Sequence, residues 1–288
     1  MYNHIAANKR KTILLIALFM ALVVVIGYTI GLQNGDVYGA MMSAAVFSGL
    51  FSIVSYYQSN KIALLSSGAR LIQKQDHPVL WHTVETLAIT SGLPMPRVAI
   101  IEDRAMNAFA TGRDPKHAVV AVTRGLLDGL SKVELEGVLA HEMSHVQNYD
   151  IRLMTVVVVL VGTLALLADL FRFGFGGRRE ENGGGSLALV GIVLLLLSPL
   201  IGELIKLAVG RSREYLADAS GALLTRYPEG LASALEKISA DRRPLKRANH
   251  ATAHLYIKEP FEESVLTRLF STHPPVTERI ARLRNMAS

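Results

Sequence analysis

Two histidines and a glutamate lie close together in the segment His141-Glu142-Met143-Ser144-His145. On an α-helix, residues i and i+4 share one face about one turn apart, so both imidazoles can bind the same metal ion. Glu142 follows the first histidine directly, where its carboxylate can accept a proton from a water molecule at the metal. A charged helix face that matches the motif by chance is the alternative. The spacing favours a zinc-dependent hydrolase.

A catalytic zinc site needs a third protein ligand and keeps a fourth position open for water. Glu214 and Asp218 are one helical turn apart, with small residues nearby that would permit close helix packing. Glu214 can be the third ligand while Asp218 accepts a hydrogen bond from a ligating histidine. A solvated helix with an Arg213–Glu214 pair is the alternative. The competing carboxylates border apolar or glycine-rich segments: Asp169, Glu180, Glu181 and Glu203.

The elements around these residues include two apolar segments near the N-terminus. Half of the 288 residues are hydrophobic, and residues 13–32 and 37–57 carry no charge at all. At about 1.5 Å per residue, each segment covers a ~30 Å hydrocarbon core, which predicts two spanning helices. A cleavable signal peptide after Lys9, Arg10 and Lys11 is the alternative. The first run is longer than the usual signal core, and no small-residue cleavage site follows it.

The distribution of positive charge predicts how this hairpin is oriented. The turn Gln33-Asn34-Gly35-Asp36 has no Lys or Arg, whereas both outer flanks are basic. The positive-inside bias therefore places the N-terminus and the chain after residue 57 in the cytoplasm. The formal net charge is +6, but no aromatic-basic stacking pattern accompanies it, so anionic lipid is the expected partner rather than nucleic acid. The absence of cysteine excludes disulfides and thiolate ligands.

We expect four parts: an N-terminal transmembrane hairpin (1–60), a cytoplasmic catalytic part with the HExxH helix (61–150), a second hydrophobic hairpin (151–210) and a C-terminal cytoplasmic part with the third ligand (211–288). The apolar runs 153–168 and 187–201 are shorter than a typical spanning helix, so they either cross the bilayer or dip into it. In the second part, residues 97–101, 107–110 and 117–123 read as strands. Ser131 and Glu134 form a capping box that begins a helix reaching about Tyr149.

Taken together, these motifs resemble the HtpX family of bacterial membrane-bound heat-shock zinc metalloproteases, whose wider family includes the CAAX prenyl proteases. The resemblance rests on HExxH, on ExxxD at Glu214 and Asp218, and on the flanking segments. These are Asn107-Ala108-Phe109-Ala110 upstream, Thr272-His273-Pro274 downstream, and the final helix around Glu278-Arg279-Ile280.

The resemblance implies one Zn²⁺ per chain, held by His141, His145 and Glu214. It also implies that Glu142 is the general base and that Asp218 accepts a hydrogen bond from a ligating histidine. It implies a mainly α integral membrane protein, with transmembrane helices and a zincin-type metallopeptidase domain containing a small β-sheet. It also implies a multi-pass protein of the bacterial cytoplasmic (inner) membrane. The expected activity is hydrolysis of misfolded or damaged membrane proteins during stress.

Further site residues and rival functions follow from the same segments. Residues 107–110 resemble the family segment beside the cleft, where an extended substrate could pair with an exposed strand edge; a buried strand is the alternative. His273 is a candidate oxyanion donor, or a histidine in a Pro-rich turn. His250 and His254 lack a nearby carboxylate motif and are expected at the surface. The rivals are a non-catalytic scaffold with a structural metal site, against which Glu142 argues, and a transporter using Glu203 and Lys206.

Overall fold

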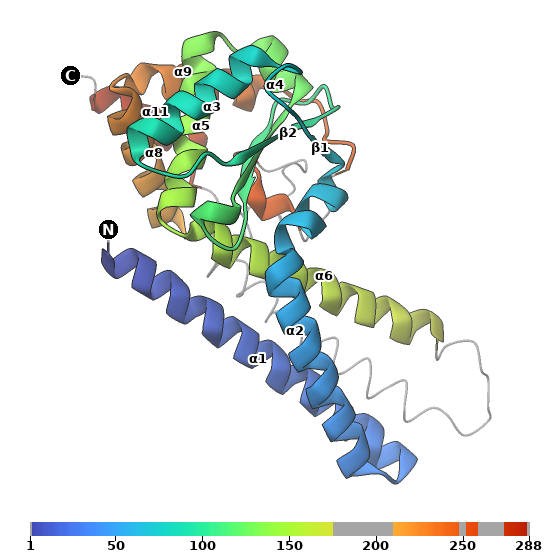
Figure 1. Cartoon of the computed structure of the whole chain (residues 1–288). Helices are drawn as coiled ribbons and strands as arrows, with labels where there is room; N and C mark the ends of the chain where they lie inside the picture. The colour runs from blue at the N-terminus through green and yellow to red at the C-terminus, as the bar shows by residue number, and fades with distance from the viewer. Residues whose placement is uncertain (1, 175–209, 248–251, 259–273, 287–288) are drawn as a thin grey trace.

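Two long helices open the chain in the computed structural model, which describes residues 2–174, 210–247, 252–258 and 274–286 (Figure 1). They are α1 (Tyr2–Asn34) and α2 (Val37–Ser67). Asp36 caps α2 by accepting a hydrogen bond from the Gly39 N–H at 2.9 Å. Gly68 ends α2 with a left-handed φ of 69°. α1 starts before residue 13 and α2 continues past residue 57, so both helices are longer than their apolar segments.

Glycines let α1 and α2 pack closely. A Cβ atom at Gly27 would lie 2.6 Å from the Cβ of Ala44 and 2.9 Å from the carbonyl oxygen of Ala40. At Gly31 it would lie 2.6 Å from the Cα of Val37. Helices in membranes associate through such small residues, because lipid offers no hydrophobic driving force between them. The hairpin predicted from the two apolar segments is therefore a packed unit.

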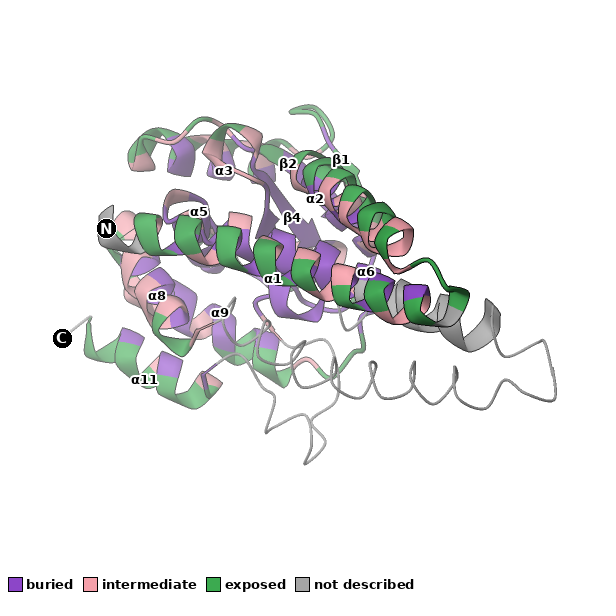
Figure 2. Cartoon of the chain, turned by 90° about the horizontal axis from the view of Figure 1, so that it is seen from below, coloured by how far each residue is buried: buried purple, intermediate pink, exposed green. Residues whose placement is uncertain are grey.

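The outer surface of this hairpin is apolar and largely uncovered. Ile5–Leu32 and Val37–Ser67 are both long and apolar enough to cross a membrane, and only 28% and 11% of their most apolar windows are buried. A core helix of a soluble protein would be mostly covered by its own chain. Figure 2 shows exposed residues along much of α1 and α2. Both helices thus have the length and the surface of membrane-spanning segments.

A small mixed sheet follows the hairpin. Its strands are β1 (Ala69–Leu71), β2 (Arg97–Ile101), β3 (Ala108–Thr111) and β4 (Val119–Thr123), in the order β1-β2-β4-β3. β2 and β4 are parallel, while the outer pairs are antiparallel. The three strands expected from the sequence are confirmed with small changes of boundary. The short β1 was not predicted.

Both faces of the sheet are buried because its side chains alternate between two cores. Val98, Ile100 and Val120 belong to a core shared with α3 (Pro78–Ser91), α5 (Lys132–Gln147) and α9 (Pro228–Ala240). Ala99, Phe109 and Ala121 face the other way, toward residues of α1 and α6 (Asp150–Gly174). The sheet therefore lies between α3, α5 and α9 on one face and α1 and α6 on the other.

Helix α5 begins at the expected capping box. The Ser131 N–H donates to Glu134 Oε2 at 2.7 Å, and the Glu134 N–H donates to Ser131 Oγ at 3.4 Å. The helix ends at Gln147, two residues before the expected boundary, because Tyr149 adopts a left-handed φ of 61°. α6 starts at Asp150 after this sharp turn.

The remaining helices of the described chain are α4 (Arg124–Gly129), α8 (Arg211–Thr225) and α11 (Val276–Asn285), with the short 3₁₀ turns η1 (Pro115–His117) and η2 (Ala253–Leu255). α8 and α9 pack against α5, and α11 packs against α9 and α8. A Cβ atom at Gly137 of α5 would lie 2.6 Å from the backbone nitrogen of Leu231 in α9. The apolar run 187–201 lies outside the described residues.

Candidate metal centre

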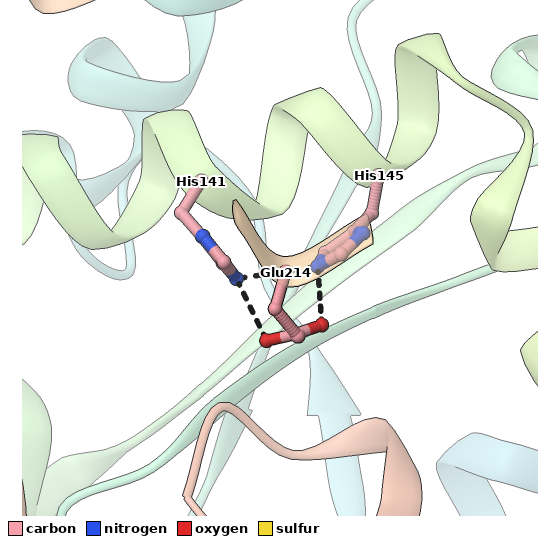
Figure 3. A group of neighbouring side chains, drawn as sticks. All are labelled: His141, His145 and Glu214. Atoms are coloured by element: carbon pink, nitrogen blue, oxygen red, sulfur yellow. Dashed lines mark hydrogen bonds and ion pairs between the residues drawn. The ribbon is translucent and has the colours of Figure 1, made fainter. Parts of the chain in front are cut away.

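Helix α5 presents His141 and His145 on one face, as their spacing predicts. The two Nε2 atoms lie 3.2 Å apart, and the two imidazoles are 1% and 4% exposed. α8 supplies the third group: Glu214 Oε2 lies 3.7 Å from His141 Nε2, and Oε1 lies 3.5 Å from His145 Nε2 (Figure 3). Among the described residues, Glu214 is the carboxylate that completes a metal-binding group with both histidines.

The close approach of α8 to α5 explains how a short glutamate side chain reaches both histidines. A Cβ atom at Gly221 would lie 3.0 Å from the backbone nitrogen of His141, so only a glycine fits here without a shift. Ala217 is fully buried in the same contact surface. The small residues near Glu214 therefore permit the helix packing expected from the sequence.

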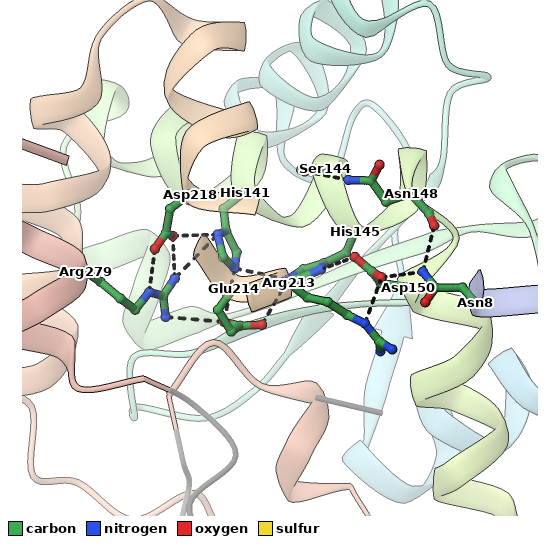
Figure 4. A network of polar contacts seen from close by, with 10 residues as sticks. All are labelled: Asn8, His141, Ser144, His145, Asn148, Asp150, Arg213, Glu214, Asp218 and Arg279. Carbon is green, nitrogen blue, oxygen red and sulfur yellow. Dashed lines mark hydrogen bonds and ion pairs between the residues drawn. The ribbon is translucent and has the colours of Figure 1, made fainter. Parts of the chain in front are cut away.

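Each histidine is also held from behind by a carboxylate. His141 Nδ1 lies 3.0 Å from Asp218 Oδ1, and His145 Nδ1 lies 3.1 Å from Asp150 Oδ2 (Figure 4). Such a contact keeps the proton on Nδ1 and leaves the Nε2 lone pair free for a metal. The place of Asp218 was predicted. Asp150 was missed, although it follows His145 by only five residues, since its place depends on the turn at Tyr149.

Arg279 of α11 completes the surroundings of the ligands and was not predicted. Its guanidinium is fully buried and donates to Asp218 at 2.8 and 2.7 Å. Its Nη1 lies 3.5 Å from Glu214 Oε2. One signal could have identified it, because Arg279 precedes the buried Leu283 by four residues and shares the inward face of an amphipathic helix.

Asn8 connects the first membrane helix to this network. Its Nδ2 donates to Asp150 Oδ1 at 2.7 Å and to the carbonyl oxygen of Asn148 at 3.0 Å. Arg213 Nε lies 3.7 Å from the same Asp150 oxygen. Asp150, which orients His145, is thus itself held by α1. The candidate metal centre lies beside the end of α1 that is predicted to face the cytoplasm.

The charges around the cluster favour a cation. Burial would lower the pKa of His145, but the hydrogen bond to Asp150 and the charge of Glu214 raise it to about 9. Burial would likewise raise the pKa of Asp218, whereas its ion pair with Arg279 lowers it and keeps the carboxylate ionised. The carboxylates therefore create a negative potential at the Nε2 atoms, the sign that a divalent metal ion requires.

The donor set and its spacing fit a zinc ion. A tetrahedral ion with bonds of about 2.0–2.1 Å has ligand atoms about 3.3 Å apart. The two histidine Nε2 atoms are 3.2 Å apart, and the nearest Glu214 oxygens lie 3.5 Å from His145 Nε2 and 3.7 Å from His141 Nε2. All the candidate ligand atoms are within 4.8 Å of one another. Two imidazoles and one carboxylate leave a fourth position open for water or substrate, as in catalytic zinc sites.

Glu142 lies next to this cluster and can exchange protons. Burial above all raises the pKa of its carboxyl, and the charge of Glu214 acts in the same direction. The Ala110 N–H of β3 donates a hydrogen bond to the Glu142 carboxylate. A glutamate whose pKa is raised is a better proton acceptor than an ordinary carboxylate and can return the proton to a leaving group.

β3 is the outermost strand of the sheet beside the site, but its edge is partly covered. Residues 107–110 are buried, the Ile257 N–H donates to the Ala108 carbonyl at 3.0 Å, and Asn107 Nδ2 donates to the Lys258 carbonyl at 2.9 Å. The edge expected to be exposed is therefore occupied at Ala108 by a segment of the chain itself. A substrate strand would have to displace Ile257 there.

Several other candidates are placed differently or are not described. His254 is buried, not at the surface as expected, and its Nε2 lies 3.0 Å from the Met154 carbonyl in α6. The remaining candidates lie outside the described residues or, for Asp169, have an undescribed side chain: Asp169, Glu180, Glu181, Glu203, Lys206, His250 and His273.

Comparisons with known proteins identify the family of the chain. The family model described as peptidase family M48 matches residues 74–287. The chain is 50% identical over 295 residues to a protease HtpX homolog of Tropheryma whipplei (strain TW08/27), covering 100% of this chain and 99% of the relative. It is 44% identical over 292 residues to a protease HtpX homolog of Dictyoglomus turgidum, covering 99% and 94%.

A solved structure shares the fold. The crystal structure of S. mikatae Ste24p superimposes with a TM-score of 0.50 and 19% sequence identity. The alignment covers 98% of this chain and 66% of that chain.

Proposed function

The chain belongs to peptidase family M48 and is a membrane-bound metalloprotease, and we propose that its metal is zinc, held by His141, His145 and Glu214. The convergence of these three groups at 3.2–3.7 Å is the observation that supports the proposal. The structural-site alternative would take a fourth protein ligand. Among the described residues, the cluster has three.

The residues around the cluster divide the reaction between them. A zinc ion, when bound, acts as a Lewis acid toward water and the peptide carbonyl. Glu142 accepts a proton from the attacking water and returns it to the leaving amine nitrogen as the C–N bond breaks. Asp218 and Asp150 orient the two imidazoles. His273, which precedes the described α11, is proposed to donate a hydrogen bond to the tetrahedral oxyanion.

The substrate is proposed to be an extended segment of a membrane protein. It would pair with β3 along residues 107–110, taking the place of Ile257 at Ala108. This contact recognises backbone rather than sequence, which suits misfolded or damaged proteins whose loops are unfolded. Degradation of such proteins under stress is the role that the HtpX resemblance implies.

The centre is proposed to face the cytoplasm from the bacterial inner membrane. The basic residues Lys9, Arg10 and Lys11 lie at the start of the first span, and Asn8 contacts Asp150 of the site directly. The site is therefore held near the bilayer surface, and we propose that residues 151–210 form a second membrane hairpin. A substrate that is already in the membrane would reach it at a high local concentration.

Metal analysis of ligand variants tests the zinc assignment. His141→Ala, His145→Ala and Glu214→Ala should each purify with less than stoichiometric zinc and lose proteolysis. Glu203→Ala, which changes a competing carboxylate, is the matched control and should retain zinc. Loss of zinc in Glu203→Ala, with retention in Glu214→Ala, would overturn the ligand set.

Substrate delivery is tested separately. One unfolded segment is supplied either free or fused to a single membrane anchor, at equal bulk concentration, to the enzyme in proteoliposomes. The anchored form should be cut faster. Equal rates would contradict delivery by the membrane while leaving the zinc assignment intact.

A further inference from the structure

A hollow of about 460 Å³ lies where α2 leaves its apolar segment. It is formed by residues 57–61 of α2, the start of β2 with the residue Met95 before it, and the loop between β3 and β4. Four of its lining side chains are permanently charged, and all are cationic: Lys61, Arg97, Arg113 and Lys116. It is distinct from the metal centre, with which it shares no residue.

The charge of this hollow is largely uncompensated. Arg113 lies 3.5 Å from Asp114, which also accepts from His117 Nδ1 at 2.7 Å. Lys61, Arg97 and Lys116 are exposed, and no carboxylate in the described part of the chain lies within ion-pair distance of them. The hollow therefore keeps a net positive charge, the condition for binding an anion.

Cation–aromatic contacts lie beside the hollow, where the apolar segment of α2 ends. The Arg113 guanidinium lies 5.0 Å from the ring centre of Tyr57, the last residue of the apolar segment 37–57. Arg152 of α6 lies 5.8 Å from the ring of Tyr56 and 5.1 Å from that of Tyr149. Tyrosines at this depth with adjacent cations are typical of a membrane–water interface.

Side chains of α2 and α6 hold the backbone of the loop between β3 and β4. The Asn60 side chain donates to the His117 carbonyl at 3.3 Å, and Arg152 Nε donates to the Arg113 carbonyl at 2.6 Å. Gly112 has a φ of 144°, and a Cβ atom there would lie 2.7 Å from the His117 carbonyl oxygen. The loop folds back on itself only because this residue is glycine. The loop that carries Arg113 and Lys116 is therefore held in one conformation.

An apolar stripe runs from the hollow toward the centre of the membrane. Leu50, Ile53 and Tyr57 precede Lys61 at helical spacing and are 61%, 58% and 57% exposed. They lie on the same face of α2 as Lys61. A molecule that fits this surface has an anionic head in the hollow and hydrocarbon along the stripe.

We propose that this hollow binds the phosphate-containing headgroup of an anionic phospholipid, whose acyl chains lie along the exposed face of α2. Arginine and lysine bind phosphate oxygens through charge-assisted hydrogen bonds. Inorganic phosphate shares this chemistry with the headgroup, but it makes no use of the apolar stripe. The two sources are therefore distinguishable.

Lipid retention by the full-length protein tests the proposal. The protein is purified in mixed micelles that contain equal amounts of phosphatidylglycerol and phosphatidylcholine, and the lipids retained are counted by native mass spectrometry. The test variant is Arg97→Gln/Lys116→Gln. The matched control is Lys132→Gln/Arg226→Gln, which removes one exposed lysine and one exposed arginine outside the hollow. Arg97→Lys/Lys116→Arg retains the charge.

The wild-type protein and the control should retain phosphatidylglycerol in preference to phosphatidylcholine. Each cation near an anionic surface contributes about five-fold in affinity, so the test variant should lose roughly an order of magnitude in this preference. The charge-retaining variant should keep most of it, which separates loss of charge from misfolding.

Any of four results would overturn the proposal. The control could lose the preference as much as the test variant, the charge-retaining variant could lose it equally, or inorganic phosphate at millimolar concentration could abolish it. The last result would assign the hollow to a soluble phosphate. A wild-type protein with no preference between the lipids would exclude both.

Discussion

His145 Nδ1 lies 3.1 Å from the carboxylate of Asp150, which belongs to the next helix and is only 2% exposed. This contact fixes the imidazole so that Nε2 faces His141 and Glu214. Asp150→Asn should therefore weaken zinc binding by about 10- to 100-fold without abolishing it. Competition with a calibrated chelator measures the affinity. Asp128→Asn, an exposed aspartate on α4, is the control and should bind zinc as the wild type does.

Asn8 should matter for the metal although it lies in the first membrane helix. Its side chain donates to Asp150 at 2.7 Å in a buried setting, so Asn8→Ala leaves that carboxylate less well held. We expect a several-fold loss of zinc affinity and of activity at limiting zinc, with recovery at excess zinc. Thr29→Ala, which removes a hydrogen bond within α1 itself, should have neither effect. Failure of excess zinc to restore activity would contradict a positioning role.

Two arginines of α11 should differ sharply in their effect on stability. Arg279→Ala removes the buried cationic partner of Asp218 and should cost about 3–5 kcal/mol, because a buried carboxylate loses its ion pair with the guanidinium. Arg284 contacts Glu229 and Glu236 at 2.9 and 2.8 Å, but all three are solvent-accessible. Arg284→Ala should barely change the melting temperature. Thermal unfolding in detergent compares the two, and equal shifts would contradict the assignment of a buried ion pair.

The hairpin packing is tested by one substitution at two glycines. Gly27→Ala places a methyl group 2.6 Å from the Cβ of Ala44, whereas at Gly49 the nearest atom is Met20 Cε at 3.8 Å. Gly27→Ala should therefore separate α1 from α2 and lower the melting temperature. Gly49→Ala should leave it unchanged or raise it, since alanine favours helix. Equal behaviour of the two variants would show that the close packing at Gly27 does not stabilise the hairpin.

The sequence predicts the parts of the site that depend on local spacing. His141 and His145 share a helix face, as do Glu214 and Asp218, because positions four apart in a helix always do. Partners brought together by the tertiary fold left no such pattern. Asn8 and Asp150 are separated by 142 residues, and Arg279 and Asp218 by 61. Asp150 is near in sequence, but its position depends on the left-handed turn at Tyr149.

For the fold as well, elements with a local sequence pattern were predicted, and elements positioned by tertiary contacts were not. The apolar segments, the capping box at Ser131 and the Val-rich strands were recognised from hydrophobic pattern and capping residues. β1 was missed because three residues, Ala69–Leu71, carry no alternating pattern and are positioned by pairing with β2. His254 was expected at the surface because the His250/His254 pair has no carboxylate motif nearby, yet packing against α6 buries it.

The central claim is that zinc at His141, His145 and Glu214 supports catalysis in which Glu142 transfers the proton. Glu142→Gln removes the proton acceptor and leaves all three proposed ligands in place. Zinc content and cleavage of an unfolded membrane-anchored substrate should be measured on the same preparation. The account predicts stoichiometric zinc with proteolysis reduced by at least two orders of magnitude. Normal turnover by zinc-loaded Glu142→Gln would contradict it.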